Sequence, residues 1–156
     1  MKISVYTIIN NPLPQLYKVN KFSVTKEELE SYGNIVNMLN KNLKVDKLSS
    51  ENIYALSLTY GMIPRGIIHV SSGKCDSCDV NIRDLAIGLL LTGAEQFICF
   101  HNHPGGNREI SVSDLKLTEQ YRTLGKIIGI EFLKHIMITQ DYFDYCEEDD
   151  DELPFS

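Results

Sequence analysis

The stretch of sequence that constrains the chain most is residues 101–114, which read His-Asn-His-Pro-Gly-Gly-Asn-Arg-Glu-Ile-Ser-Val-Ser-Asp. Side chains at positions i and i+2 of a strand point to the same face, so His101 and His103 can converge on one metal ion. The Pro-Gly-Gly-Asn segment lets the chain turn back, and Asp114 then lies in the first turn of the next predicted helix. The spacing therefore predicts a site of two imidazoles and one carboxylate.

This ligand set suits zinc, and three protein ligands leave a position open for water, as in catalytic zinc sites. Bound zinc lowers the pKa of water to about 7 and polarises a carbonyl, which is the chemistry of peptide and amide hydrolysis. A simpler interpretation also fits, because Ser111 and Asp114 match a helix-capping box and His-x-His pairs occur in ordinary strands. The two halves together, joined by a glycine-rich turn, favour the metal site.

The full pattern of His-x-His, seven residues, Ser, two residues and Asp resembles the JAMM motif of the JAB/MPN metalloprotease superfamily. His-Asn-His-Pro-x-Gly, followed by Ser-x-x-Asp and Thr118, is similar to the bacterial RadC branch of that superfamily. The resemblance extends from about residue 51 to about residue 139. The chain departs from the branch at Gly105, where serine is usual, and at Ile110, where proline is common.

The resemblance implies a role for each motif residue. His101, His103 and Asp114 would be the ligands of the zinc ion (Zn²⁺), and Ser111 would donate a hydrogen bond to the oxyanion of the tetrahedral intermediate. The implied activity is that of a zinc metallopeptidase or isopeptidase acting on a peptide or protein substrate.

The general acid/base implied by the resemblance is a glutamate that enters an upstream strand, and Glu51 stands at the matching place. It would take a proton from the attacking water and return it to the leaving amine. Spacing alone leaves this role open between Glu51, Glu95 and Glu109.

Two alternatives to hydrolysis are a binding module and a zinc nucleobase deaminase. RadC relatives suggest a non-catalytic binding module in a DNA-repair-related or protein assembly, although the helix-hairpin-helix region of full-length RadC proteins is missing here. Glu51 discriminates between these functions, because a scaffold needs no carboxylate beside a metal ion. A zinc nucleobase deaminase is disfavoured, because it needs His-x-Glu followed by Pro-Cys-x-x-Cys, whereas here Cys75 and Cys78 lie upstream. We expect these two cysteines to be ordinary loop residues.

Length and charge indicate one domain with a tail. A chain of 156 residues with 43% hydrophobic composition can bury one core. We predict a single domain over 1–140, with an N-terminal hairpin and helix in 1–47 and the motif-bearing core in 48–140. Of the 21 acidic residues, eight lie in 141–156 without any basic residue, which predicts a disordered acidic tail.

Composition also bears on location and partners. The sequence has neither an apolar run long enough for a membrane span nor a signal peptide, so we expect a cytoplasmic protein. Basic residues are scattered rather than clustered, which gives no signal for nucleic-acid binding.

The pattern of strands and helices predicts an α/β fold with a mixed sheet flanked by helices on both faces, and the resemblance implies the similar cytidine-deaminase-like JAB/MPN architecture. We expect a helix opening at the capping box of Thr25 and Glu28, and helices ended by Gly93 and Gly129. His69 is expected to be a structural or surface histidine, and His135 structural or a partner of a metal ligand. The expected strands cover residues 3–9, 16–19, 52–59, 63–70, 96–100 and 130–139.

Overall fold

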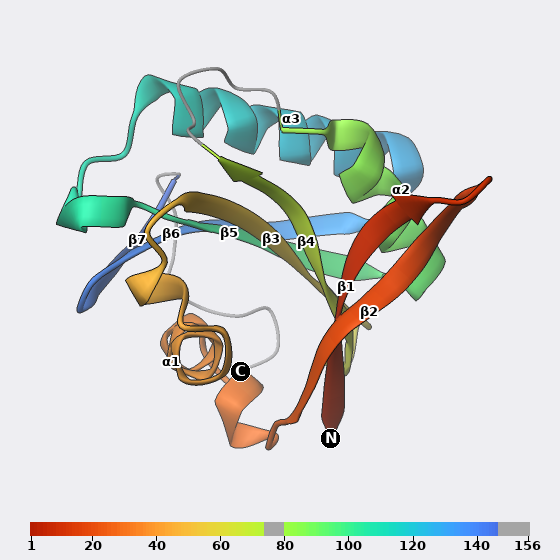
Figure 1. Ribbon diagram of the computed structural model, residues 1–156, viewed down its shortest axis with the longest axis horizontal. Coiled ribbons are helices and arrows are strands. Elements are labelled where there is room, and N and C mark those ends of the chain that lie inside the picture. Colours follow the sequence, from red (N-terminus) through yellow and green to blue (C-terminus); the bar gives the residue numbers. More distant parts are fainter. Residues whose placement is uncertain (74–79, 147–156) are drawn as a thin grey trace.

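One mixed β-sheet forms the centre of the protein, as predicted (Figure 1). The computed structural model describes residues 1–73 and 80–146. Within these residues the strand order is β2-β1-β4-β3-β5-β6-β7. β1 pairs in parallel with β4 and β5 with β6, whereas the other neighbours are antiparallel. The strands are β1 Lys2–Asn10, β2 Pro14–Ser23, β3 Glu51–Leu58, β4 Pro64–Gly73, β5 Gln96–Asn102, β6 Glu131–Thr139 and β7 Tyr142–Tyr145.

Helices cover both faces of this sheet, which confirms the predicted layer arrangement. α1 (Tyr32–Leu43) lies on one face, and α2 (Ile82–Thr92) and α3 (Val112–Ile128) lie on the other (Figure 1). α2 and α3 end at the predicted glycines, Gly93 and Gly129, whose φ values of 68° and 71° lie in the left-handed region that glycine adopts without strain.

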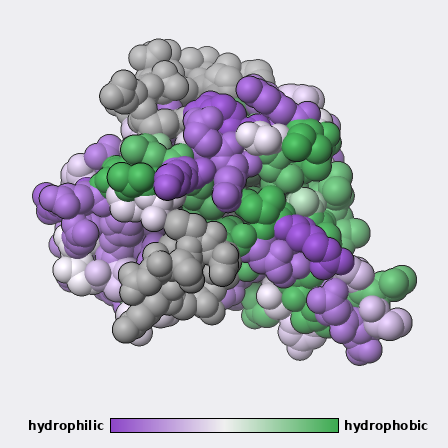
Figure 2. Space-filling view, turned by 90° about the horizontal axis from the view of Figure 1, so that it is seen from above, coloured by the Kyte–Doolittle hydropathy of each residue, from purple (hydrophilic) through white to green (hydrophobic). Residues whose placement is uncertain are grey.

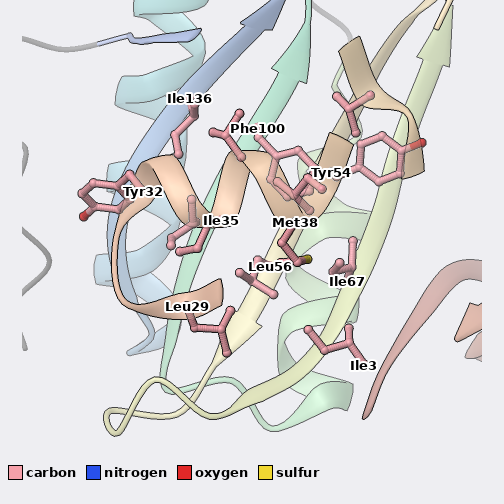
Figure 3. Close-up of a cluster of buried hydrophobic side chains, with 14 of the residues drawn as sticks. Ile3, Leu29, Tyr32, Ile35, Met38, Tyr54, Leu56, Ile67, Phe100 and Ile136 are labelled. Atoms are coloured by element: carbon pink, nitrogen blue, oxygen red, sulfur yellow. The ribbon is translucent and has the colours of Figure 1, made fainter. Parts of the chain in front are cut away.

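The sheet separates two hydrophobic cores because successive strand residues point to opposite faces. Figure 3 shows the core on the α1 face, where Ile35 and Met38 of α1 meet Leu56, Ile67 and Phe100 of the sheet. The other core joins Leu85 of α2 and Tyr121 of α3 to the alternate strand positions, which include Ala55, Phe97 and Cys99. Every residue of β5 is buried, so this strand is fixed from both sides.

α3 lies very close to the sheet at Gly125. A Cβ atom added there would meet the backbone oxygen of Ile130 at 2.5 Å and the Phe97 ring at 3.3 Å. The absence of a side chain at Gly125 therefore sets how closely α3 packs over β5 and β6.

The first helix begins later than predicted. The expected capping box is formed, since the Thr25 nitrogen donates to Glu28 and the Glu28 nitrogen donates to the Thr25 hydroxyl, but it closes a 3₁₀ turn over Glu27–Leu29. Ser31 then adopts an extended conformation and its side chain accepts from the Asn34 nitrogen at 3.1 Å. This second cap starts α1 at Tyr32, so the predicted start at Thr25 is wrong.

The C-terminal boundary also differs from the prediction. Tyr142–Tyr145 forms β7, which pairs with β6, so these residues belong to the sheet and not to a disordered tail. Cys75, Cys78 and the acidic residues 147–156 lie outside the described residues. Among the helices that the structure describes, none has the length and apolar character needed to cross a membrane.

Seen from the side of α2 and α3, the surface carries both hydrophilic and hydrophobic residues (Figure 2). Leu90 and Leu91 of α2 are exposed hydrophobic side chains, with 57% and 52% of their surface accessible. The loop that leads into α3 is instead rich in exposed polar residues.

The close packing of α3 gives a stability prediction. Replacing Gly125 by alanine should destabilise the fold by about 1–3 kcal/mol, because the new methyl group meets backbone atoms that cannot rotate away. Gly33→Ala in the first turn of α1 is the control, since its Cβ finds open contacts of 3.7 Å or more and should instead add about 0.4–1 kcal/mol. Urea unfolding of both variants measures the difference. Equal stabilities would contradict the packing argument.

Candidate metal centre

The pairing of β3 with β5 brings two distant parts of the sequence together. Ile53 pairs with His101 in this antiparallel ladder. Continuing the register by two residues places Glu51 opposite His103, on the sheet face covered by α3. The end of β5 and the start of β3 therefore contribute adjacent polar side chains.

The loop after His103 turns the chain toward α3. It contains a 3₁₀ turn at Pro104–Gly106, in which Gly105 and Gly106 have φ values of 81° and 80°. Glycine adopts these values without steric cost. Asn107 then returns close enough for its carbonyl oxygen to lie 3.1 Å from Nδ1 of His103, which orients that ring.

The start of α3 places Asp114. Ser111 is the N-cap, and both bonds of the capping box are present: the Asp114 nitrogen donates to the Ser111 hydroxyl at 3.0 Å, and the Ser111 nitrogen donates to Asp114 Oδ2 at 2.8 Å. The same carboxylate reaches Nε2 of His101 at 3.2 Å and Nε2 of His103 at 3.4 Å. The capping and the metal-site interpretations are thus both compatible with the structure.

The geometry of these three side chains fits a divalent metal ion. The Nε2 atoms of His101 and His103 lie 3.0 Å apart, and Asp114 approaches them with both oxygens, Oδ1 at 3.2 Å from His101 and Oδ2 at 3.4 Å from His103. Ligands at about 2.0–2.1 Å from a tetrahedral zinc ion would be about 3.3–3.4 Å apart. Glu51 completes the group, because one ligand atom from each of the four residues lies within 4.8 Å of the others.

The charges of the group are strongly coupled. Burial would raise the pKa of Asp114, but hydrogen bonds from His101 and His103 hold it far below its ordinary value. The bond to Asp114 raises the pKa of His103 against the opposing effect of burial, with a smaller contribution from the charge of Glu51. The metal-free site therefore favours an ionised carboxylate beside a proton-binding imidazole.

A buried chain of hydrogen bonds supports His101 from behind. Its Nδ1 lies 2.8 Å from Nε2 of His135, and Nδ1 of His135 lies 2.8 Å from the Thr118 hydroxyl. Thr118 in turn donates to the carbonyl of Asp114 at 2.9 Å. If Nε2 of His101 offers its lone pair to a metal, Nδ1 of His101 must donate to Nε2 of His135. Nδ1 of His135 must then donate to the Thr118 hydroxyl.

His135 is not a member of the four-residue group but contacts His101, one of its predicted ligands. Burial lowers the pKa of His135, which favours the neutral ring. The β5–β6 register, which pairs Cys99 with His135, is what brings it there. Sequence spacing could not supply that register. His69 stacks on Tyr54 instead, on the opposite face of the sheet.

The other two glutamates considered for proton transfer lie elsewhere. Glu95 is at the far end of β5, where it accepts a bond from the Tyr60 nitrogen at 2.7 Å. Glu109 lines the cleft beside the site, which has a volume of about 470 Å³, but does not belong to the four-residue group. Glu51 and Ser111 line the same cleft.

A mixed sheet with helices on both faces and this site at the end of its central strands define a protein of the JAB/MPN class. Residues 29–150 match the RadC-like JAB domain family, and the chain belongs to that family.

Curated relatives carry a name that states no activity. A UPF0758 protein of Clostridium acetobutylicum is 36% identical over 100 residues, covering 62% of this chain and 44% of that protein. A UPF0758 protein of Halalkalibacterium halodurans is 34% identical over 112 residues, covering 70% of this chain and 47% of its own length. The chain thus spans less than half the length of these two relatives.

The hydrogen-bond chain behind His101 predicts an effect on metal affinity. Thr118→Val removes the acceptor of His135 and should weaken zinc binding by about 10–100-fold, because His101 loses its orientation. Thr123→Val, at an exposed position of the same helix, should leave the affinity unchanged. Competition with a chromophoric chelator measures both. Equal affinities of the two variants would show that the chain does not orient His101.

The raised pKa of His103 predicts how metal binding depends on pH. Protons occupy this ring over a wider range than in an ordinary histidine, and zinc must displace them. Zinc affinity should therefore rise with pH through the region above the usual value of about 6.5 and level off once the ring is neutral. Chelator competition at several pH values tests this; a flat profile between about pH 6 and 8 would contradict it.

Proposed function

We propose that this domain is a zinc-dependent hydrolase that cleaves a peptide or isopeptide bond in a peptide or protein substrate. The observation that carries the proposal is the convergence of Glu51 with His101, His103 and Asp114 beside an open cleft. Three of these residues would form a ligand set for a divalent ion, and the fourth is a carboxylate suited to proton transfer.

His101, His103 and Asp114 would hold the zinc ion. When bound, zinc lowers the pKa of water and polarises the carbonyl group of a substrate. The protein contributes rigid placement, because His101 and Asp114 are 1% and 4% exposed and each is held by further hydrogen bonds. Such placement reduces the reorganisation that the reaction requires.

Glu51 would move the proton. Its side chain is partly exposed at the edge of the cleft, so its carboxylate can accept a proton from water there and return it to the leaving amine. Among the described residues, no hydrogen bond ties up this carboxylate. A scaffold without hydrolytic activity has no need for such a group, so the binding-module alternative has less support.

Ser111 would stabilise negative charge on the substrate. Its hydroxyl oxygen accepts the Asp114 nitrogen, which leaves the hydroxyl proton free to donate into the cleft. A single donor to an oxyanion typically contributes about 2.7–4 kcal/mol to lowering the barrier.

Metal content separates the roles of the four residues. The native protein, purified without added metal, should contain about one zinc ion per chain by elemental analysis, as a site with three protein ligands predicts. His103→Ala should lose most of it, whereas Glu51→Gln should retain it, because Glu51 is not proposed as a ligand. A native protein that takes up no zinc even when supplied with it would overturn the proposed function.

Hydrolysis tests the role of Glu51 directly. In a screen of peptide and isopeptide substrates with the zinc-loaded protein, Glu51→Gln should lower kcat by about 10²–10⁴-fold while zinc content stays constant. Glu109→Gln removes another carboxylate from the same cleft and should have a much smaller effect. Similar losses in the two variants would point to the charge of the cleft rather than to proton transfer by Glu51.

A further inference from the structure

Asn102, between the two candidate histidine ligands, faces away from them. Strand geometry sends His101 and His103 to the α3 face and the residue between them to the α1 face. Asn102 is 2% exposed, and within the described residues its side chain bonds to residues 48–52, which lead into β3 and form its start.

The side-chain amide of Asn102 binds the backbone on both sides of Glu51. Its Oδ1 accepts the backbone nitrogen of Asn52 at 2.7 Å, and its Nδ2 donates to the carbonyls of Ser50 at 2.9 Å and Leu48 at 3.4 Å. The residues immediately before and after Glu51 are therefore bound to one buried side chain.

These side-chain bonds continue the pairing of β3 with β5 beyond the last backbone pair of the two strands. The last backbone pair toward the site is Ile53 with His101. One step further, the side chain of Asn102 accepts the nitrogen of Asn52. The ladder is thereby extended toward the position where Glu51 lies opposite His103.

The side-chain amide of Asn52 also restrains this segment. The Asn52 side chain donates to the Ser50 carbonyl at 2.9 Å and lies 3.0 Å from Nε2 of His69. His69 is itself stacked on Tyr54 at 4.7 Å between ring centroids. The Ser50–Asn52 backbone thus belongs to a partly buried polar network, which restrains its position.

From these contacts we propose that Asn102 is a positioning residue for Glu51. It ties the backbone on both sides of Glu51 to the strand that carries the two histidines, and so holds the carboxylate over the metal site. The inference rests on the proposed function, because it assumes that Glu51 acts beside a bound ion. Asparagine fits this task because one planar group supplies both the acceptor and the two donated bonds.

The test uses the full chain loaded with cobalt(II), whose visible absorption senses groups beside the ion. Glu51→Gln should move the pH midpoint of the spectral change and so calibrates the influence of the carboxylate. Asn102→Leu should move the midpoint in the same direction by at least half as much, with cobalt content unchanged. The double variant should move no further than Glu51→Gln, because Asn102 acts through Glu51.

A control and a metal-free measurement distinguish positioning from general loss of stability. Ser57→Ala removes a buried hydrogen bond from the far end of β3 and should leave the midpoint unchanged. In metal-free protein, the amide proton of Asn52 should exchange about tenfold faster or more in Asn102→Leu. It should stay protected in Asn102→Asp, which keeps the acceptor.

Three different results would overturn the proposal. If Glu51→Gln moves the midpoint and Asn102→Leu does not, Asn102 does not position the carboxylate, while the proposed function stands. If Glu51→Gln itself moves nothing, the role of Glu51 fails and the positioning role fails with it. A shift in Ser57→Ala equal to that in Asn102→Leu would also reject a specific role.

Discussion

The candidate site depends on the antiparallel pairing of β3 with β5. This pairing is the contact that places a glutamate from the start of one strand beside histidines from the end of another, some fifty positions later in the chain. Both strands lie at the centre of the sheet, with a hydrophobic core on each side, so their register is strongly specified. The hydrophobic packing around these central strands therefore also fixes the side chains at their ends, where the candidate site lies.

Asp114 connects the helix layer to this sheet. Its carboxylate accepts the nitrogen of Ser111 and contacts both histidines, so the group that begins α3 also completes the candidate ligand set. Helix capping alone would fix the first turn, and the Gly125 contact fixes how closely the helix approaches the sheet. Together they hold a charged group in a buried position that would be costly without its partners.

Sequence reasoning succeeded where the determining interactions are local. The strand-turn-helix run that holds His101, His103 and Asp114 was predictable because strand alternation, glycine turns and capping all act over a few residues. Glu51 could be chosen only through the family resemblance, since the register that brings it to His103 is a long-range property. The start of α1 was mispredicted because Ser31, six residues after Thr25, provides a competing cap. The contacts of His135 and Asn102 could not be predicted, because they depend on how β5 pairs with β6 and with β3.

The alternation His-Asn-His has a consequence for how this site can change. The candidate histidine ligands and the amide proposed to position Glu51 are neighbouring residues of one strand, and they point to opposite faces of the sheet. A slip of β5 by one position would place an amide among the candidate ligands and imidazoles in the α1 layer, and would turn each buried side chain of the strand toward the wrong core. A single insertion or deletion in β5 should therefore disturb the candidate ligand set, the bonds of Asn102 beside Glu51 and the packing of both cores together.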